Sequence, residues 1–476
     1  MSYKFNKKLQ NLVDSIDDGM NSIVNSTARV SSRVIDKHIC IGVTGFSGSG
    51  KSTFITSLIH QLRFSNEASL SGFLPARDQK IVEVNLLPLP HLELFDYQKN
   101  IESLSSSPPK WPNSTSELSG CVVEIIYKRN SYLKSILGEH TKLKIEIRDY
   151  PGEWILDIPL LEQDYFSWSI ENSNLFQQPE RKKILGSFYM KLQSISPFDV
   201  LSETEIDDIC DNYIQFLKNC KNNGMTLIQP GRMLLSGSSD LFSYFFPVLG
   251  LKQYDKSALD KADENCIYKV MNSRFSAYQD DIVKPFYHDF FKSVDRQIIL
   301  IDTLKALGGS KDNFEDMMIA FSRIIDSYKV GLNGFLDRVT SPKVERIIFL
   351  SSKPDGILIS QHENLRHLTD DIIKRVCKQS IRNSINIETE IACAVRTTED
   401  MNTHLTATLM DGKRGKVVHP IIPENIPTQT DWDSFKNWQP LEFQPPVIPG
   451  LKFGAKLPCI RIDKVLKDLI GDKFND

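Results

Sequence analysis

Short, uninterrupted apolar runs alternate along the chain with longer stretches in which apolar residues recur at helical spacing. The run at 38–44 has no polar alternation, which is typical of a strand buried on both faces of a sheet. Similar runs occur at 297–302, 346–351 and 390–395, and each is followed by a helical stretch or a loop. This order of elements predicts an α/β fold built on a mostly parallel sheet that is flanked by helices.

The remaining segments predict additional structure around this sheet. Two β-rich runs, 121–129 and 142–149, are joined by a short connection and could pair as antiparallel strands. The pattern from 153–295 is mainly helical, and residues 4–31 predict an amphipathic helical arm ahead of the main fold. A hairpin is expected around the Asp-Gly pair at 411–412.

Composition narrows the class of protein without defining its chemistry. The chain has 476 residues, of which 41% are hydrophobic and 25% charged, as in ordinary globular proteins. Its net charge of −3 argues against a dedicated nucleic-acid binder. No apolar run is long enough for a transmembrane segment, the N-terminus lacks the apolar core of a secretory signal, and eight cysteines contain no C-x-x-C pair. We therefore expect a cytoplasmic protein without a disulfide framework or zinc site.

A glycine-rich stretch directly follows the first buried run. Residues 45–52 read G-F-S-G-S-G-K-S, which matches the phosphate-loop pattern G-x-x-x-x-G-K-[ST] (the Walker A motif) between a strand and a helix. Successive N–H groups of such a loop surround a phosphate, while Lys51 supplies charge and Ser52 offers its hydroxyl to Mg²⁺. The predicted phosphate-binding residues are Gly45, Ser47, Gly48, Ser49, Gly50, Lys51, Ser52 and Thr53.

A second anchor for the metal is expected at the end of a neighbouring strand. Asp149 ends the run at 142–149 and opens a D-x-x-G tetrad that closes at Gly152. The Asp149 carboxylate can hold Mg²⁺, and the Gly152 N–H can contact the γ-phosphate. Glu153 follows directly and is the candidate group for positioning the attacking water. Ordinary strand-end turns have the same pattern, so the interpretation depends on the phosphate loop upstream.

A threonine that senses the γ-phosphate is expected shortly before the run at 121–129. The stretch W-P-N-S-T ends at Thr115, at the place where small G proteins carry their switch threonine. We predict Thr115 as a ligand of the metal and the γ-phosphate, with Ser114 as its rival. An ordinary surface-loop threonine is an equally good interpretation.

The run at 346–351 leads into S-K-P-D, which is close to the guanine-reading pattern [NT]-K-x-D. The stem of Lys353 would pack on the base, and Asp355 would accept the N1–H and N2–H of guanine. Ser352 replaces the usual asparagine or threonine, which weakens the guanine assignment, although its hydroxyl could still tie this loop to the phosphate loop. Ala394 and Val395, at the end of a later strand, are expected to close over the guanine.

These residues together resemble the YcjX family of bacterial P-loop proteins. The resemblance rests on stretches that span nearly the whole chain, at 43–60, 111–115, 148–161, 227–232, 352–355, 394–399 and 459–466. It implies a Ras-like G domain with a helical insertion, binding and hydrolysis of GTP, and a link to the stress response. Spacing and composition alone indicate only a P-loop NTPase.

The expected architecture is a Ras-like α/β P-loop NTPase with a large, mainly helical insertion. Its predicted parts are the helical arm (1–34), the first part of the G domain (35–152), the insertion (153–295), the second part of the G domain (296–400), a hairpin and proline-rich extension (401–455) and a terminal strand and helix (456–476).

The expected reaction is Mg²⁺-dependent hydrolysis of GTP to GDP, with Lys51, Glu153 and Thr115 as catalytic residues. An ATPase with the same phosphate machinery remains an alternative. So does a nucleotide-gated scaffold with negligible turnover, which would bind a protein partner through its insertion. Arg232, in the Q-P-G-R stretch of the insertion, is a candidate internal arginine finger.

Overall fold

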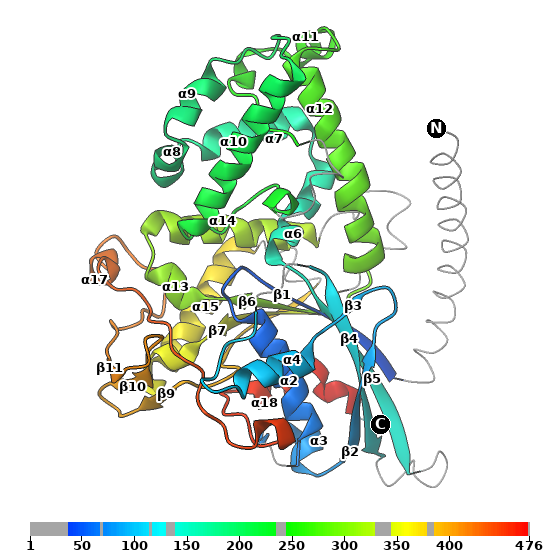
Figure 1. Cartoon of the computed structure of the whole chain (residues 1–476), viewed down its shortest axis with the longest axis vertical. Coiled ribbons are helices and arrows are strands. Elements are labelled where there is room, and N and C mark those ends of the chain that lie inside the picture. The colour runs from blue at the N-terminus through cyan, green and yellow to red at the C-terminus, as the bar shows by residue number, and fades with distance from the viewer. Residues whose placement is uncertain are drawn as a thin grey trace.

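An eight-stranded sheet forms the centre of the molecule (Figure 1). The computed structural model describes residues 37–66, 70–113, 117–129, 139–234, 244–328, 344–377 and 385–474. The strand order is β2-β4-β5-β1-β6-β7-β8, with β3 paired to β4. The strands are β1 (Lys37–Gly45), β2 (Ile81–Pro88), β3 (Glu93–Leu94), β4 (Ser119–Lys128), β5 (His140–Asp149), β6 (Arg296–Ile301), β7 (Arg346–Ser352) and β8 (Asn386–Ala392).

Five neighbouring strands, from β5 through β1, β6 and β7 to β8, run parallel. β4 is antiparallel to both β5 and β2, so the expected antiparallel pair is confirmed. In the register, Val43 lies beside Asp149 on one side and Ile298 on the other. Parallel strands bring their carboxyl ends to one edge of the sheet, where nucleotides bind in such folds. The predicted α/β class with a Ras-like arrangement is therefore confirmed.

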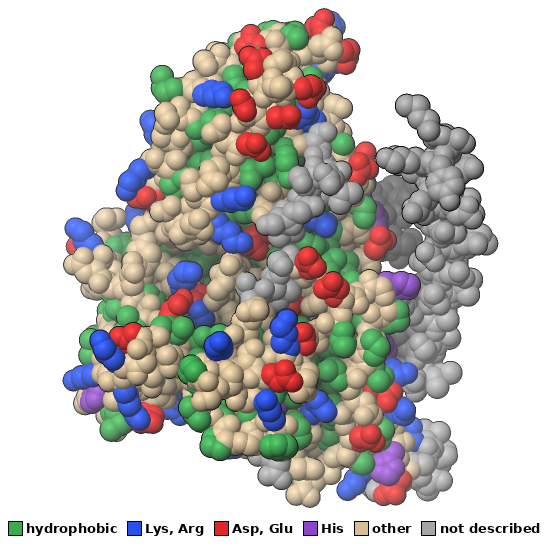
Figure 2. All heavy atoms as spheres, viewed as in Figure 1, with side chains coloured by type: hydrophobic (Ala, Val, Ile, Leu, Met, Phe, Trp, Pro, Cys, Tyr) green, Lys and Arg blue, Asp and Glu red, His purple; other side chains and the backbone are tan. Residues whose placement is uncertain are grey.

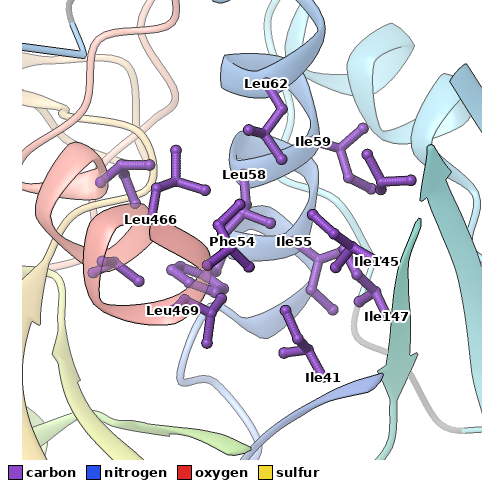
Figure 3. Close-up of a cluster of buried hydrophobic side chains, with 14 of the residues drawn as sticks. Ile41, Phe54, Ile55, Leu58, Ile59, Leu62, Ile145, Ile147, Leu466 and Leu469 are labelled. Carbon is purple, nitrogen blue, oxygen red and sulfur yellow. The ribbon is translucent and has the colours of Figure 1, made fainter. Parts of the chain in front are cut away.

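The sheet is covered by helices on both faces. On one face, α2 (Lys51–Arg63) and α18 (Ile462–Ile470) pack against the central strands (Figure 3). Phe54 and Leu58 of α2 lie in the same buried cluster as Leu469 of α18 and Ile145 of β5. On the other face, α14 (Lys311–Ser327) and α15 (His362–Val376) contribute to a second cluster. Burial on both faces explains why β1 contains an apolar run without polar alternation.

Between β5 and β6 the described chain is helical, and most of it forms a separate group of helices beyond the sheet (Figure 1). This group has its own buried cluster, drawn from Leu160 to Val283 and rich in aromatic side chains. The boundaries at 153 and 295 stay a prediction. The helices are α6 (Gly152–Asp157), α7 (Tyr165–Leu175), α8 (Pro179–Leu185), α9 (Ser187–Gln193), α10 (Glu203–Asn222), α11 (Lys256–Asp260) and α12 (Ile267–Tyr278).

The other elements are short. The expected hairpin is present as β10 (Leu405–Thr408) and β11 (Arg414–Val417), with β9 (Thr398–Asp400) beside it. The expected helical arm lies outside the described residues. Further helices are α3 (Leu74–Arg77), α4 (Tyr97–Leu104), α13 (Thr303–Leu307) and α17 (Trp432–Phe435).

Charges of both signs are interspersed on the face shown in Figure 2, and several acidic side chains gather at the outer end of the helical group. All eight cysteines lie in the described part of the chain and are free. No helix of that part combines the length and the apolar character needed to cross a membrane.

Candidate nucleotide-binding site

The phosphate loop leaves β1 and enters α2 through two residues in the left-handed region. Gly48 has φ 85° and Gly50 has φ 83°, a backbone conformation that glycine adopts without a steric penalty. The Ser49 N–H donates to the Phe46 carbonyl (3.0 Å) and closes the turn. The sequence thus folds locally into the compact loop that the motif predicts, with α2 beginning at Lys51.

Lys51 of the loop forms an ion pair with Asp149 at the end of β5. Both groups are buried: the side chain of Lys51 is 8% exposed and that of Asp149 is fully enclosed. The hydroxyl of Ser119 lies 3.4 Å from the second carboxylate oxygen. Two of the predicted phosphate and metal residues, which are 98 positions apart, are therefore in direct contact.

The residues predicted to hold magnesium have suitable chemistry. Ser52 occupies the first turn of α2, directly after Lys51, and Asp149 contacts that lysine. Hydroxyl and carboxylate oxygens are the donors that Mg²⁺ prefers, and Mg²⁺ usually takes one or two protein ligands together with phosphate oxygens and water. The donor set of Ser52 and Asp149 fits that ion.

The D-x-x-G tetrad packs tightly against the phosphate loop. A Cβ atom on Gly152 would lie 3.0 Å from the carbonyl carbon of Gly45 and 3.2 Å from the nitrogen of Phe46. The Thr44 hydroxyl donates to the Tyr150 carbonyl (3.0 Å) and fastens the tetrad to β1. A side chain at position 152 would require the two segments to move apart by a few tenths of an ångström, so glycine favours this close approach.

Glu153, the candidate for positioning water, is turned toward the helical group. Its carboxylate forms a 2.7 Å ion pair with Lys221 of α10. Arg232, the candidate arginine finger, stacks on the ring of Trp154 at 3.9 Å and donates to the Ile282 carbonyl (3.1 Å). Burial lowers the pKa of Arg232. Thr115 and its rival Ser114 lie outside the described residues.

The S-K-P-D loop is joined to the phosphate loop by Lys353. Its ammonium donates to the Gly48 carbonyl (2.6 Å) and pairs with the Asp302 carboxylate (2.7 Å). Burial works against the charge of Lys353, but Asp302 outweighs it and the pKa of the lysine is raised. This positive group therefore stays charged between the two loops.

Asp355 is held by the segment that follows β8. One of its carboxylate oxygens accepts from the Thr397 N–H (2.9 Å) and from the Thr397 hydroxyl (2.7 Å). The suggested tie from Ser352 to the phosphate loop is wrong, because its hydroxyl donates to the Ile301 carbonyl (3.1 Å) on the neighbouring strand. Lys353 makes that tie instead.

Ala394 and Val395, which follow β8, are held against α2 and the buried cluster beneath it. The Ala394 carbonyl accepts from the Ser57 hydroxyl of α2 (2.7 Å), and Val395 is buried in the cluster under that helix. Their placement at the base stays a prediction. The residue that sequence reasoning missed is Thr397, for which the only signal was the hydroxyl pair T-T in the stretch A-V-R-T-T-E.

The parallel sheet with an antiparallel edge, the phosphate loop and the lysine that joins it to the S-K-P-D loop define a Ras-like P-loop protein. Comparison with known proteins identifies the family. The family model described as "YcjX-like family, DUF463" matches residues 39–474, so the chain belongs to the YcjX-like family. The expected resemblance is thereby confirmed.

Two curated relatives match over nearly the full length, and both are named Ras-like GTPase YcjX. The protein from Escherichia coli (strain K12) is 30% identical over 469 residues, which is 96% of this chain and 100% of the relative. The protein from Shewanella oneidensis (strain MR-1) is 30% identical over 486 residues, which is 96% of this chain and 99% of the relative. These names support the class of a GTPase-like P-loop protein.

Proposed function

We propose that this chain is a Mg²⁺-dependent GTPase that hydrolyses GTP to GDP and phosphate. The observation that carries the proposal is the bond from Lys353 to the Gly48 carbonyl, which joins the S-K-P-D loop to the phosphate loop. A nucleotide whose base lies along the stem of Lys353 would then have its phosphates next to the N–H groups of the phosphate loop. The names of the two relatives agree with this substrate.

Guanine specificity is assigned to Asp355. A carboxylate has about four lone-pair sites, and Thr397 uses two of them on one oxygen. The remaining sites can accept the N1–H and N2–H of guanine, whereas adenine has no hydrogen on N1. The two bonds from Thr397 fix the carboxylate in one orientation, so a base that lacks those donors would leave a buried acceptor unsatisfied.

In the proposed reaction the oxygen of a water molecule attacks the γ-phosphorus in line with the bond to the bridging oxygen. That bond breaks, GDP leaves with its electron pair, and the water's proton ends on the products. Lys51 and the loop N–H groups stabilise the charge on the phosphates, Gly152 donates to the γ-phosphate, and Glu153 accepts a hydrogen bond from the water. Mg²⁺, held by Ser52, Asp149 and Thr115, would neutralise charge shared by the β- and γ-phosphates.

Two measurements test the proposal. Calorimetry with GDP and ADP in the presence of Mg²⁺ should show tight binding of GDP alone. Equal or tighter binding of ADP would favour the ATPase alternative. A single-turnover assay with GTP should then release phosphate, and its absence in a chain that binds GTP would favour the nucleotide-gated scaffold.

The family resemblance further supports a role as a cytoplasmic regulatory switch in the stress response, with the insertion as the surface for a protein partner. A deletion strain carrying the wild-type gene should survive stress better than one carrying Lys51→Ala. Equal survival of the two strains would contradict a nucleotide-dependent role.

A further inference from the structure

Asp157 is the last residue of α6, the helix that begins at Gly152 of the D-x-x-G tetrad. It is 1% exposed, and its carboxylate accepts from the N–H of Gly231 (2.9 Å) and the N–H of Arg232 (3.2 Å). The hydroxyl of Tyr278, at the end of α12, donates to the same carboxylate (2.5 Å). All three donors belong to the chain between β5 and β6, beyond α6 itself.

Three more contacts attach α6 to the same part of the molecule. The Gln229 side chain donates to the Leu156 carbonyl (2.5 Å), Arg232 stacks on Trp154, and Lys221 pairs with Glu153. Figure 1 shows α6 at the place where the helical group meets the sheet.

The opposite end of α6 touches the phosphate loop. Gly152 packs closely against Gly45, where an added Cβ atom would lie 3.0 Å from the carbonyl carbon. At the helical-group side, a Cβ atom on Gly231 would lie 2.3 Å from the Glu153 carbonyl oxygen, so this contact is closer still. The short helix is therefore fixed at both sides, with the phosphate loop on one and the Q-P-G-R stretch on the other.

A buried carboxylate is an unfavourable choice if its only task is to hold the fold together. Burial raises the pKa of Asp157 to about 6, which shows that its charged form is poorly solvated there. Apolar residues of similar volume commonly replace buried charged groups without loss of stability. What an apolar residue cannot supply is a directional bond to three donors at once.

We propose that Asp157 is a positioning residue for the γ-phosphate: it fixes α6 to the helical group and thereby holds the Gly152 N–H against the phosphate loop. This inference rests on the proposed GTPase function. GDP has no γ-phosphate, so Asp157 affects the triphosphate complex and leaves the diphosphate complex unchanged. Because coupling is reciprocal, binding of the triphosphate in turn tightens the contact between α6 and the helical group.

The experiment compares affinities for GDP and for a non-hydrolysable GTP analogue in the full chain, measured by calorimetry with Mg²⁺. Asp157→Asn keeps the size of the side chain but turns one acceptor into a donor, and Tyr278→Phe removes one donor. Each variant should bind the GTP analogue about 2- to 10-fold more weakly, the range that corresponds to loss of one net hydrogen bond. Their affinity for GDP should stay within twofold of the wild type.

Tyr165→Phe is the matched control. Tyr165 is fully buried in the same helical group, and its hydroxyl donates to the Phe246 carbonyl (2.8 Å) and accepts from the Val248 N–H (3.2 Å), away from α6. The Tyr165→Phe variant should lose about as much thermal stability as Tyr278→Phe, while the ratio of its affinities for the GTP analogue and GDP stays unchanged. In the double variant, Asp157→Asn with Tyr278→Phe, the loss should be smaller than the sum of the two single losses.

Equal weakening of both nucleotides, or no change in either, would show that Asp157 is only structural and would overturn the inference. If Asp157→Asn does not fold, Tyr278→Phe alone decides between these outcomes. A wild-type chain that binds neither guanine nucleotide would refute the proposed function itself. If the wild type binds both nucleotides and the variants keep the same ratio of the two affinities, only the inference about Asp157 is refuted.

Discussion

The ammonium of Lys353 lies 2.6 Å from the carbonyl oxygen of Gly48, although the two residues are 305 positions apart in the sequence. Lys353 follows β7 and Gly48 follows β1, with β6 between these strands in the sheet. The contact forms because parallel strands deliver their connections to the same edge. It sets the separation between the loop assigned to the base and the loop assigned to the phosphates.

We expect Lys353→Met to weaken binding of GDP and GTP alike by about 10- to 100-fold, because the variant loses a charged hydrogen bond and the link between the two loops. Calorimetry with both nucleotides measures the effect. Lys305→Met is the control: Lys305 is exposed, and its ammonium lies 3.5 Å from where a Cβ on Gly48 would be. A similar loss of affinity in both variants would show that Lys353 contributes only its positive charge and not the link between the two loops.

Lys51→Ala should abolish tight nucleotide binding and also destabilise the free protein. The substitution removes the lysine of the ion pair with the fully buried Asp149, and breaking such a pair from one side costs about 3–5 kcal/mol. Urea unfolding measures the stability, and calorimetry measures the binding. The double variant Lys51→Ala with Asp149→Ala should regain part of the stability but none of the affinity. Unchanged nucleotide affinity in Lys51→Ala would refute the phosphate-loop assignment.

Glu153→Ala should slow GTP hydrolysis by about 100-fold while the affinity for a non-hydrolysable GTP analogue stays within a few-fold, because positioning of water matters mainly in the transition state. Single-turnover assays measure the rate. Lys221→Met, which removes only the partner of this carboxylate, should slow the reaction less. Hydrolysis at the wild-type rate in Glu153→Ala would exclude Glu153 from the mechanism, and Arg232→Ala would be the next variant to assay.

Asp157 also predicts a dependence of stability on pH. Burial raises its pKa from 3.8 to about 6, and the groups that face it are the Tyr278 hydroxyl and the Arg232 guanidinium. Stability from a group with a raised pKa is present below the unfolded value and is lost as the pH rises through the folded value. The free energy of unfolding of the wild type minus that of Asp157→Asn should therefore fall by about 2 kcal/mol between pH 4 and pH 7.

Asp164→Asn provides a control of opposite sign. Burial alone would raise the pKa of Asp164, but the hydrogen bonds from Lys256 and Ser167, together with the charge of Lys256, outweigh it and the pKa is lowered. The free energy of unfolding of the wild type minus that of Asp164→Asn should therefore rise with pH. Urea unfolding at several pH values between 2 and 7 checks both trends, because the rise for Asp164 occurs mainly below pH 4 and the fall for Asp157 mainly above it. A flat difference for Asp157→Asn would contradict the assigned burial.

The parts of the site that lie on one continuous stretch of sequence could be predicted. The phosphate loop needs only its glycines, Lys51 and the flanking strand and helix, and the uniform apolar character of β1 identified a strand buried on both faces. The edge strand β2 was missed because Val82 and Leu87 are both apolar and exposed, so its sequence shows neither the alternation of a half-buried strand nor full burial.

Contacts between distant segments could not be predicted in this way. Nothing near Asp157 in the sequence shows that it accepts from Gly231, 74 positions away, and from Tyr278, 121 positions away. In the same way, nothing near Ser352 in the sequence shows that its hydroxyl donates to Ile301 of the adjacent strand and not to the phosphate loop. Side-chain direction depends on strand register, which a single sequence does not specify here.

The choice of base can be reversed at Asp355. In Asp355→Asn one acceptor oxygen becomes an amide donor, and xanthine carries a carbonyl where guanine carries its 2-amino group. The variant should bind GDP more weakly by about 1–3 kcal/mol, the cost of a mismatched buried polar group, and should gain affinity for XDP. Competition of XDP and GDP against a labelled guanine nucleotide measures the shift.

Thr397→Val, which removes the hydroxyl but keeps the N–H, is the control, and it should weaken the binding of GDP without favouring the binding of XDP. If Asp355→Asn binds GDP as tightly as the wild type and ignores XDP, the S-K-P-D segment is only a turn and the ATPase alternative becomes the better explanation.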